Sequence, residues 1–315
     1  MKIIPYEPKH AVRWNQFVHT ARNGSFLFDR NYMDYHADRF EDASVILEKA
    51  GNIVAVLPAH QKGDVVCSHE GLTFGGFIIA NRMRLKLMEQ VVDTTLDFYA
   101  GKGFSLLRYS PMPLIYFKHP SQEDLAVLLN RGATLVRSKT SSACLASTAP
   151  SDSARRAALD AAGKGIVIDT WTDVAGFYAM LANWLQLRYQ ATPVHTLEEL
   201  TLLCKRFPEN IRIIAAWHQG HPVAATLIFA NPTCQRFQYG ALTPAGLKLN
   251  ARKALDAHLV SSAPAGTWMD FGTSMLPGTD EISHSLHLSK ELVGARAMLQ
   301  CTYEIPLRSA HENHL

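Results

Sequence analysis

Hydrophobic residues follow two spacings along the chain, and these predict strands and helices in alternation. Short apolar runs bounded by turn residues predict strands at 44–47, 53–57, 65–67, 104–109, 134–136, 211–217, 223–229, 236–242, 268–271 and 299–305. Apolar residues three or four positions apart predict helices at 10–21, 32–40, 83–99, 125–130, 177–190, 196–207 and 250–261. The alternation predicts an α/β (α+β) fold in which mixed central sheets are flanked by helices.

One stretch, 268–296, has the order strand, loop, helix and stop. Its apolar first part, 268–271, predicts the end of a buried strand. A helix cap is expected at 279–280, and Gly294 is expected to end that helix. The polar Ser274 would then lie at the C-terminal end of a strand and near a helix start, where α/β sheets bind ligands. An ordinary crossover without a ligand has the same pattern.

The order of the predicted elements repeats in the two halves of the chain. The run Phe74-Gly75-Gly76 precedes a helix in the first half, and Tyr239-Gly240-Ala241 precedes one in the second. Between the halves, residues 147–165 are small, polar and rich in alanine, which is typical of a linker with a connecting helix. We therefore expect two domains, at 1–150 and 151–315.

Composition narrows the function classes. The chain has 315 residues, 47% of them hydrophobic, and a net charge of +3, which gives no reason to expect nucleic-acid binding. No apolar run approaches the ~20 residues of a membrane span, and a proline and charges interrupt any apolar region near the N-terminus. The five cysteines are scattered without a CxxC spacing, so we expect neither a disulfide framework nor a zinc site, and we expect a cytoplasmic location.

The segment 243–258 is the first candidate for chemistry. It follows a predicted strand, contains Gly246, and brings Lys248 and Arg252 to the start of a helix, whose free N–H groups would suit a diphosphate. A basic helix start that faces solvent has the same composition. The equivalent region of the first half, 75–86, also carries basic residues at a helix start and is not excluded by the sequence.

Two segments of the first half, 30–40 and 68–76, combine aromatic, histidine and acidic residues. Aromatic faces can stack on a base, carboxylates can hold an amine or hydroxyls, and arginines can meet phosphate. The substrate-binding candidates are Arg30, Tyr32, Asp34, Tyr35, His36, His69 and Glu70. A satisfied polar network in the core would have the same composition. We expect no metal, because the alternation of Asp34, His36 and Asp38 would suit one only on a strand and this segment predicts a helix.

A histidine in the second half is the candidate general base. His195 lies in a loop just before a helix that opens with the capping box Thr196-Leu197-Glu198-Glu199. It could accept the proton of an attacking ammonium group. A loop histidine bonded to the backbone is the structural alternative.

The run Leu288-Ser289-Lys290-Glu291-Leu292-Val293-Gly294-Ala295 resembles the last helix of GNAT-type acyltransferases, with Lys290 at a position that commonly holds tyrosine. With Asp270-Phe271-Gly272 upstream, it is more similar to the FemAB-related two-domain branch of that superfamily. The repeated element order extends the resemblance over essentially the whole chain. It implies tandem GNAT-like domains, the first on the acceptor side and the second on the acyl-CoA side.

The resemblance also implies an activity and a set of residues. Coenzyme A or acyl-CoA would be the co-substrate, and the acceptor would be an amine. The residues that would bind coenzyme A are Tyr239, Gly240, Ala241, Leu242, Gly246, Lys248, Leu249, Asn250, Ala251, Arg252 and Ser274. The catalytic candidates are His195, Lys290 and Asp270. The chain departs from the family at Asn250 and Arg252, where small glycine-like residues are usual, so the grip on the diphosphate is in question.

Within this branch, the chain resembles bacterial enzymes of surface-polysaccharide pathways, such as O-antigen synthesis, that acylate a nucleotide-linked (dTDP) amino sugar. Two alternatives stay open. One is a Fem-like transferase that uses charged tRNA, although the long basic helical arm common in those enzymes does not occur here. The other is a sugar- or nucleotide-binding protein without catalysis. The sequence leaves a homo-oligomer open.

Overall fold

A computed structural model describes residues 1–146, 148–276 and 278–307, and it divides the chain into two compact units. The first unit is Met1–Ser138 together with the chain from Gln300 onward, and the second is Lys139–Leu299. The last strand, β15 (Arg296–Pro306), therefore begins in the second unit and has the rest of its length, from Gln300, in the first. The chain passes from the first unit to the second between Ser138 and Lys139, whereas the sequence places the boundary at 150.

The strands of the first unit form two groups. One is a four-stranded sheet in the order β1-β3-β4-β7. In the other, the order is β15-β8-β6-β5-β2, and the pairing of β6 with β8 is parallel. The bounds are β1 Lys2–Pro5, β2 Glu41–Asp42, β3 Val45–Lys49, β4 Asn52–Leu57, β5 His60–Lys62, β6 Val65–Cys67, β7 Ile78–Ile79, β8 Leu106–Tyr109 and β15 Arg296–Pro306.

The helices of the first unit cover a core of aliphatic side chains from β3, β4 and β8. The long helix α3 contributes Met88, Val91 and Val92, which are spaced for one helical face and are fully buried. The bounds are η1 Pro8–His10, α1 Ala11–Thr20, η2 Phe26–Phe28, α2 Arg30–Met33, η3 Asp34–Arg39, α3 Leu85–Gly101, η4 Leu114–Tyr116 and α4 Glu123–Asn130.

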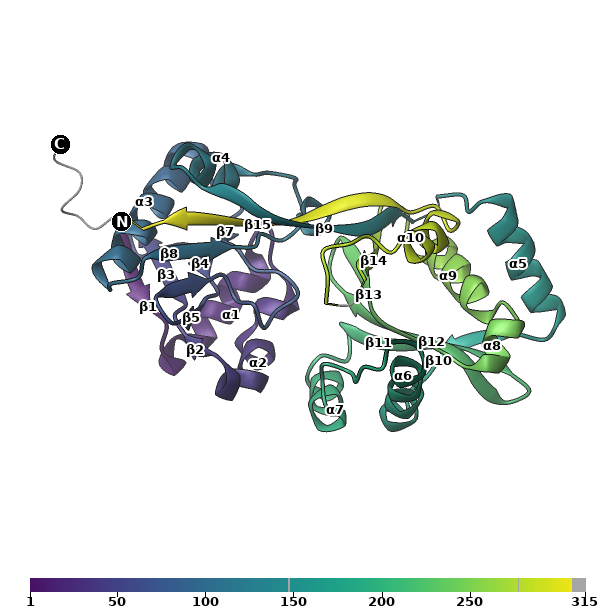
Figure 1. The fold of residues 1–315 in the computed structure, drawn as a ribbon. Coiled ribbons are helices and arrows are strands. Elements are labelled where there is room, and N and C mark those ends of the chain that lie inside the picture. Colours follow the sequence, from purple (N-terminus) through teal and green to yellow (C-terminus); the bar gives the residue numbers. More distant parts are fainter. Residues whose placement is uncertain (147, 277, 308–315) are drawn as a thin grey trace. The chain divides into compact units, whose positions relative to one another are not determined.

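The second unit is built on a mixed sheet in the order β10-β11-β12-β13-β14-β9. Its pairing is antiparallel except between β13 and β14, which are parallel. Figure 1 shows helices α5 and α9 on one side of these strands and α6 and α7 on the other. The strand bounds are β9 Thr134–Leu145, β10 Val167–Thr170, β11 Ile211–His218, β12 His221–Ala230, β13 Cys234–Leu242 and β14 Trp268–Thr273. The helix bounds are α5 Asp152–Gly163, α6 Val174–Tyr189, α7 Leu197–Arg206, α8 Pro244–Lys248, α9 Ala251–Ser262 and α10 His284–Glu291.

The structure corrects four of the local expectations. The predicted linker is part of the second unit, because Ala154 and Ala161 of α5 are buried in its core; Ser147 lies outside the described residues. Helix α10 begins only at His284, after a loop in which Met275 pairs with Ile282, so the expected cap at 279–280 is wrong. A short helix, α8, interrupts the segment between β13 and α9. The predicted helix at 32–40 is a short α-helix followed by a 3-10 helix that kinks at His36.

Candidate active site

The parallel pair β13 and β14 separates part-way along its length. The register joins Cys234 to Trp268 and ends where Arg236 pairs with Asp270, although β13 continues to Leu242. A register shift next to Leu227 on β12 changes the course of β13 at this point. The edge of β13 beyond Arg236 therefore offers backbone N–H and C=O groups that β14 does not use.

An ion pair stands at the point of separation. Arg236 Nη1 lies 2.6 Å from Asp270 Oδ2, and the Asp270 side chain is fully buried. The other carboxylate oxygen of Asp270 accepts from the Gly272 backbone N–H at 2.8 Å and from Ser141 Oγ at 3.2 Å. Asp270, a catalytic candidate of the sequence, thus holds the end of β14 in place. Sequence reasoning missed Arg236, whose only signal is a charge at the start of an otherwise apolar strand.

The start of helix α9 is uncapped. Asn250 precedes the helix in the left-handed region, with a φ of 56°, and its side chain makes no capping hydrogen bond. The first N–H groups of α9, from Ala251 onward, are therefore available to an anion. Glycine and asparagine tolerate this φ best. Asn250 can therefore take the place of the glycine-like residue expected there.

Gly246 is placed differently from a phosphate-binding glycine. It is buried in α8, and a Cβ there would lie 2.1 Å from the Val223 carbonyl oxygen, so glycine allows the helix to pack on β12. Its backbone N–H is bonded to Thr243 Oγ1 at 3.0 Å. Lys248, at the end of the same helix, is exposed. Gly246 therefore shapes the loop, and the N–H groups that face outward are those of α9.

Arg252 of α9 lies over the backbone of β13. A Cβ built on Gly240 would come within 2.0 Å of Arg252 Nη1, so the glycine leaves room for the guanidinium. Arg252 Nε donates to Asp256 Oδ2 at 2.7 Å. Burial raises the pKa of Asp256, although Arg252 opposes the shift, and Asp256 Oδ1 has no hydrogen-bond partner among the described residues. Arg252 is thus a positioned cation and not a mobile surface charge.

Lys290 reaches back from α10 to the end of β14. Its Nζ donates to the carbonyl oxygens of Gly272 at 2.9 Å and Thr273 at 2.8 Å, and to Ser274 Oγ at 3.0 Å. The residue is 8% exposed. Burial lowers the pKa of Lys290 to about 7, and the charge of Asp270 opposes this shift. Lys290 therefore ties α10 to β14 and would titrate near neutral pH.

His195 and Tyr239 form the third polar group of the second unit. His195 Nδ1 lies 2.6 Å from Tyr239 Oη, and the imidazole is buried just before the cap of α7. Tyr239 lies on β13 beyond the last residue that pairs with β14. Since successive side chains of a strand point to opposite faces, Tyr239 faces His195 while its neighbour Gly240 faces Arg252. The structure therefore places Tyr239 and Gly240 on opposite faces of β13, with His195 beside one and Arg252 beside the other.

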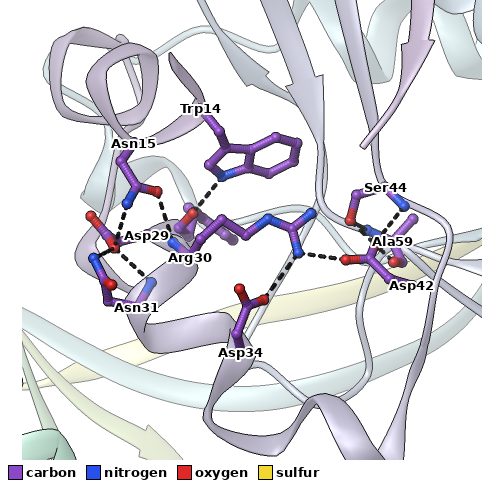
Figure 2. A network of polar contacts seen from close by, with 10 residues as sticks. Trp14, Asn15, Asp29, Arg30, Asn31, Asp34, Asp42, Ser44 and Ala59 are labelled. Carbon is purple, nitrogen blue, oxygen red and sulfur yellow. Dashed lines mark hydrogen bonds and ion pairs between the residues drawn. The ribbon is translucent and has the colours of Figure 1, made fainter. Parts of the chain in front are cut away.

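The first-unit candidates lie in two clusters. Arg30, 3% exposed, is the centre of one, shown in Figure 2. Its guanidinium carbon lies 3.3 Å from the centre of the Tyr6 ring and 4.4 Å from that of Trp14. Its Nη1 donates to Asp42 Oδ2 at 2.5 Å and to Asp34 Oδ1 at 3.3 Å. Two aromatic rings and two carboxylates thus surround the Arg30 guanidinium. This is the arrangement of a structural cation–π contact.

The second cluster gathers rings around His36. Tyr35 stacks on His36 with ring centres 4.2 Å apart, and His36 Nε2 contacts the Gly71 carbonyl oxygen at 3.1 Å. His69 lies 5.5 Å from His36, and burial, with the charge of His60 adding to it, lowers the pKa of His69 to about 3. Tyr32 packs edge-on to Tyr35. Glu70 follows and pairs with Lys62 and Arg108.

Comparison with known proteins agrees with this geometry. Residues 151–280 match the family model of the acetyltransferase (GNAT) domain. Among solved structures, FemX aligns with a TM-score of 0.70 and 9% identity over 98% of each chain. The C-terminal domain of a protein described as a lysylphosphatidylglycerol synthetase from Agrobacterium fabrum has a TM-score of 0.58 and 10% identity, over 97% of this chain and 94% of that one. No curated protein sequence matches the chain.

A tandem GNAT protein from the clavulanic acid biosynthesis pathway also aligns over 98% of each chain, with a TM-score of 0.50 and 11% identity. The fold is therefore a mixed α/β fold that resembles tandem-GNAT and Fem-like structures, and the match to the acetyltransferase (GNAT) domain model lies within its second unit. At these identities the likeness to solved structures is one of fold. Among the described residues, no helix combines the length and apolar character that a bilayer span requires.

Proposed function

We propose that the protein is an N-acyltransferase that moves an acyl group from acyl-CoA to the amino group of a nucleotide-linked amino sugar. A dTDP-linked sugar such as dTDP-3-amino-3,6-dideoxygalactose is the acceptor we would test first, in the cytoplasmic stage of O-antigen or capsule synthesis. The observation that carries the donor half of this proposal is the separation of β13 from β14 beside the uncapped start of α9.

The residues present fit a coenzyme A. The N–H groups at the start of α9, from Ala251 onward, would meet its diphosphate, with Arg252 held beside them and the exposed Lys248 close in sequence. The edge of β13 beyond Arg236 would bind the amide-containing arm, because β14 does not pair with that part of the strand. When bound, the acyl-CoA supplies a thioester, which an amine can attack directly.

The chemistry needs a proton acceptor, an oxyanion site and a group near the leaving thiolate. His195 would take the proton that the amine loses as it attacks the thioester, with Tyr239 setting which ring nitrogen is available. Backbone N–H groups at 239–241 would meet the oxyanion. For Lys290, the three acceptors around Nζ favour a positioning role, in which the lysine fixes the end of β14 beside the reacting atoms.

We assign acceptor recognition to the first unit. Tyr35 is partly exposed and stacked on His36, so one ring of the pair can stack on a nucleobase. Tyr35→Ala should raise the acceptor KM about fivefold, since a stacked aromatic pair contributes on the order of 1 kcal/mol. The Kd for coenzyme A should change less than about twofold. The control is Tyr189→Ala, a partly exposed tyrosine in α6.

Two measurements test the proposal. Calorimetry with coenzyme A should show binding in the micromolar range, and a mass-spectrometric screen of nucleotide-amino sugars against acyl-CoAs should show one acylated product. Coenzyme A binding without any acylated sugar would refute the acceptor and keep the donor. No binding at millimolar coenzyme A would refute the donor; it would favour either transfer from charged tRNA or a binding protein without catalysis.

A further inference from the structure

A second group of chemically reactive side chains lies in the first unit, on the hairpin of β5 and β6. His60 and Cys67 are direct cross-strand partners in this antiparallel pair, so their side chains lie next to each other on one face. His60 is 3% exposed and Cys67 is fully buried. A thiol beside an imidazole, shielded from solvent, is half of the donor set that zinc prefers.

The chain then turns sharply and brings a carboxylate to the same place. His69 adopts a φ of 66° immediately after β6, and its N–H bonds to the Cys67 carbonyl oxygen at 2.7 Å. The turn places Glu70 Oε2 3.9 Å from His60 Nε2. One ligand atom from each of His60, Cys67 and Glu70 lies within 4.8 Å of the other two. Ligand atoms around a tetrahedral zinc ion are separated by about 3–4 Å, given bonds of ~2.0–2.3 Å.

A further histidine packs against His60, outside the three residues whose ligand atoms lie within 4.8 Å of one another. The ring of His69 is 5.4 Å from that of His60, centre to centre, and is 7% exposed. Its Nδ1 has no hydrogen-bond partner among the described residues. A buried, uncharged imidazole nitrogen without a partner is costly unless something binds it. A buried imidazole nitrogen without a partner therefore belongs to a ring that packs against His60.

We propose that His60, Cys67 and Glu70 bind one divalent cation of the zinc type, with the ring of His69 packed beside His60. The mixture of sulfur, nitrogen and oxygen donors selects Zn²⁺ over Mg²⁺ or Ca²⁺. Binding displaces the thiol proton of Cys67 into solution, because the thiolate is the ligand. It also requires the His60 tautomer with its proton on Nδ1, so the 3.3 Å hydrogen bond from the Glu70 backbone N–H would be lost.

Two cations bind the Glu70 carboxylate and would compete with a metal ion for it. Lys62 Nζ lies 3.2 Å from Oε2, and Arg108 Nη1 lies 3.2 Å from Oε1. Both side chains have access to solvent and can move away when a cation takes their place. Their positive charge opposes the incoming metal, so removing one should tighten binding. The sequence expectation of no metal was based on the scattered cysteines and on the spacing of Asp34, His36 and Asp38. It did not consider the pairing of His60 with Cys67, which the register of β5 and β6 creates.

The test uses the full-length protein, reduced and freed of metal by a chelator. Titration with Zn²⁺ against a chromophoric chelator should show one equivalent bound. Cys67→Ser and His60→Ala should each weaken the affinity at least ~10-fold, and Lys62→Met should strengthen it. With Co²⁺, the wild type should show the absorption of a thiolate-to-cobalt transition, which Cys67→Ser should lose.

Matched controls separate the site from general cysteine chemistry and from folding. Cys301→Ser removes a partly buried cysteine outside the cluster and should leave Zn²⁺ affinity unchanged. If Cys67→Ser unfolds the protein, Glu70→Gln replaces a half-exposed ligand and should still weaken binding. Binding of Zn²⁺ that survives His60→Ala and Glu70→Gln together, or an absent thiolate transition with Co²⁺, would overturn the proposal. Neither outcome depends on acyl transfer.

Discussion

Each unit contains one parallel strand pair beside a long helix, and the two pairs differ in how they end. In the second unit, β13 and β14 stop pairing at Arg236 and Asp270, although both strands run on. In the first unit, β6 and β8 pair along the full length of β6, and the contact continues beyond it. A parallel pair that opens provides free backbone, whereas one that stays closed does not.

Two residues close the first-unit pair. The Ser68 backbone N–H donates to the Arg108 carbonyl oxygen at 2.8 Å, and Ser68 Oγ accepts from the Ser110 N–H at 2.8 Å. Gly75 then bridges the same strand end by donating to the Ser110 carbonyl oxygen at 2.8 Å. A Cβ on Gly75 would lie 1.6 Å from the Ser68 carbonyl oxygen, so only glycine permits the closure.

This difference between the strand pairs shows why basic residues in the sequence could not identify the half that binds the cofactor. Arg82 and Arg84 precede α3 as exposed side chains, much as Lys248 and Arg252 accompany α9. The charge patterns are alike, and the difference lies in backbone pairing between strands far apart in sequence. We therefore infer the cofactor half from the open edge of β13 and not from charge.

The strongest test of this comparison removes the cations of each half in turn. Lys248→Ala with Arg252→Ala should weaken coenzyme A binding by roughly 10²–10⁴-fold, because each charge-assisted contact to phosphate contributes about 1.5–3 kcal/mol. The matched pair Arg82→Ala with Arg84→Ala should leave the Kd within about twofold. Calorimetry measures both, and the reverse result would move the cofactor to the first unit.

The next effect concerns turnover. His195→Gln removes the base we propose and should lower kcat by about 10²–10⁴-fold with the coenzyme A Kd nearly unchanged. Tyr239→Phe removes the hydrogen bond to His195 Nδ1 but keeps the base, so it should lower kcat less. As a first-unit control, His119→Gln changes a histidine outside both clusters and should leave kcat as it is. Steady-state kinetics with melting temperatures gives both readouts, and normal turnover of His195→Gln would exclude this histidine as the base.

The sequence predicted most helices and strands correctly but few contacts of the candidate site. The expected strand at 65–67 is β6, the capping box at Thr196 and Glu199 is confirmed, and Gly294 has the positive φ of a helix end. These features depend on neighbours a few residues away. Helix α8 was missed because Pro244 and Gly246 read as turn residues, while the packing of Gly246 on β12 makes the turn helical.

The polar groups of the site depend on distant parts of the chain and had no local signal. Asp256 is one helical turn from Arg252, but its burial under the sheet is a tertiary property. The contact of His195 with Tyr239 joins two candidates that the sequence placed in separate roles. Arg30 was expected to meet phosphate, and the rings of Tyr6 and Trp14, far from it in sequence, enclose it instead.

A smaller effect is expected from Lys290→Met. The change leaves the buried Gly272 carbonyl oxygen and the partly buried Thr273 carbonyl oxygen without this donor and removes one partner of Ser274 Oγ, so the free energy of unfolding should fall by about 2–4 kcal/mol. If Lys290 were instead a general acid, kcat would fall by at least about two orders with an unchanged melting temperature. Measuring urea unfolding and kcat on the same variant separates positioning from acid catalysis.

The smallest predicted effect is a dependence of stability on pH that belongs to Lys290. Burial lowers its folded-state pKa to about 7, whereas the unfolded chain keeps the ordinary value of 10.5. Between these values the unfolded state binds more protons, so the free energy of unfolding should rise with pH, by at most about 1.4 kcal/mol per unit. Below about pH 7 both states are protonated and this slope vanishes. Urea unfolding at pH 7, 8 and 9 should show a steeper rise for the wild type than for Lys290→Met. Equal slopes would mean that the three oxygen acceptors keep the lysine charged, and the open end of β14 would then carry a permanent ammonium group.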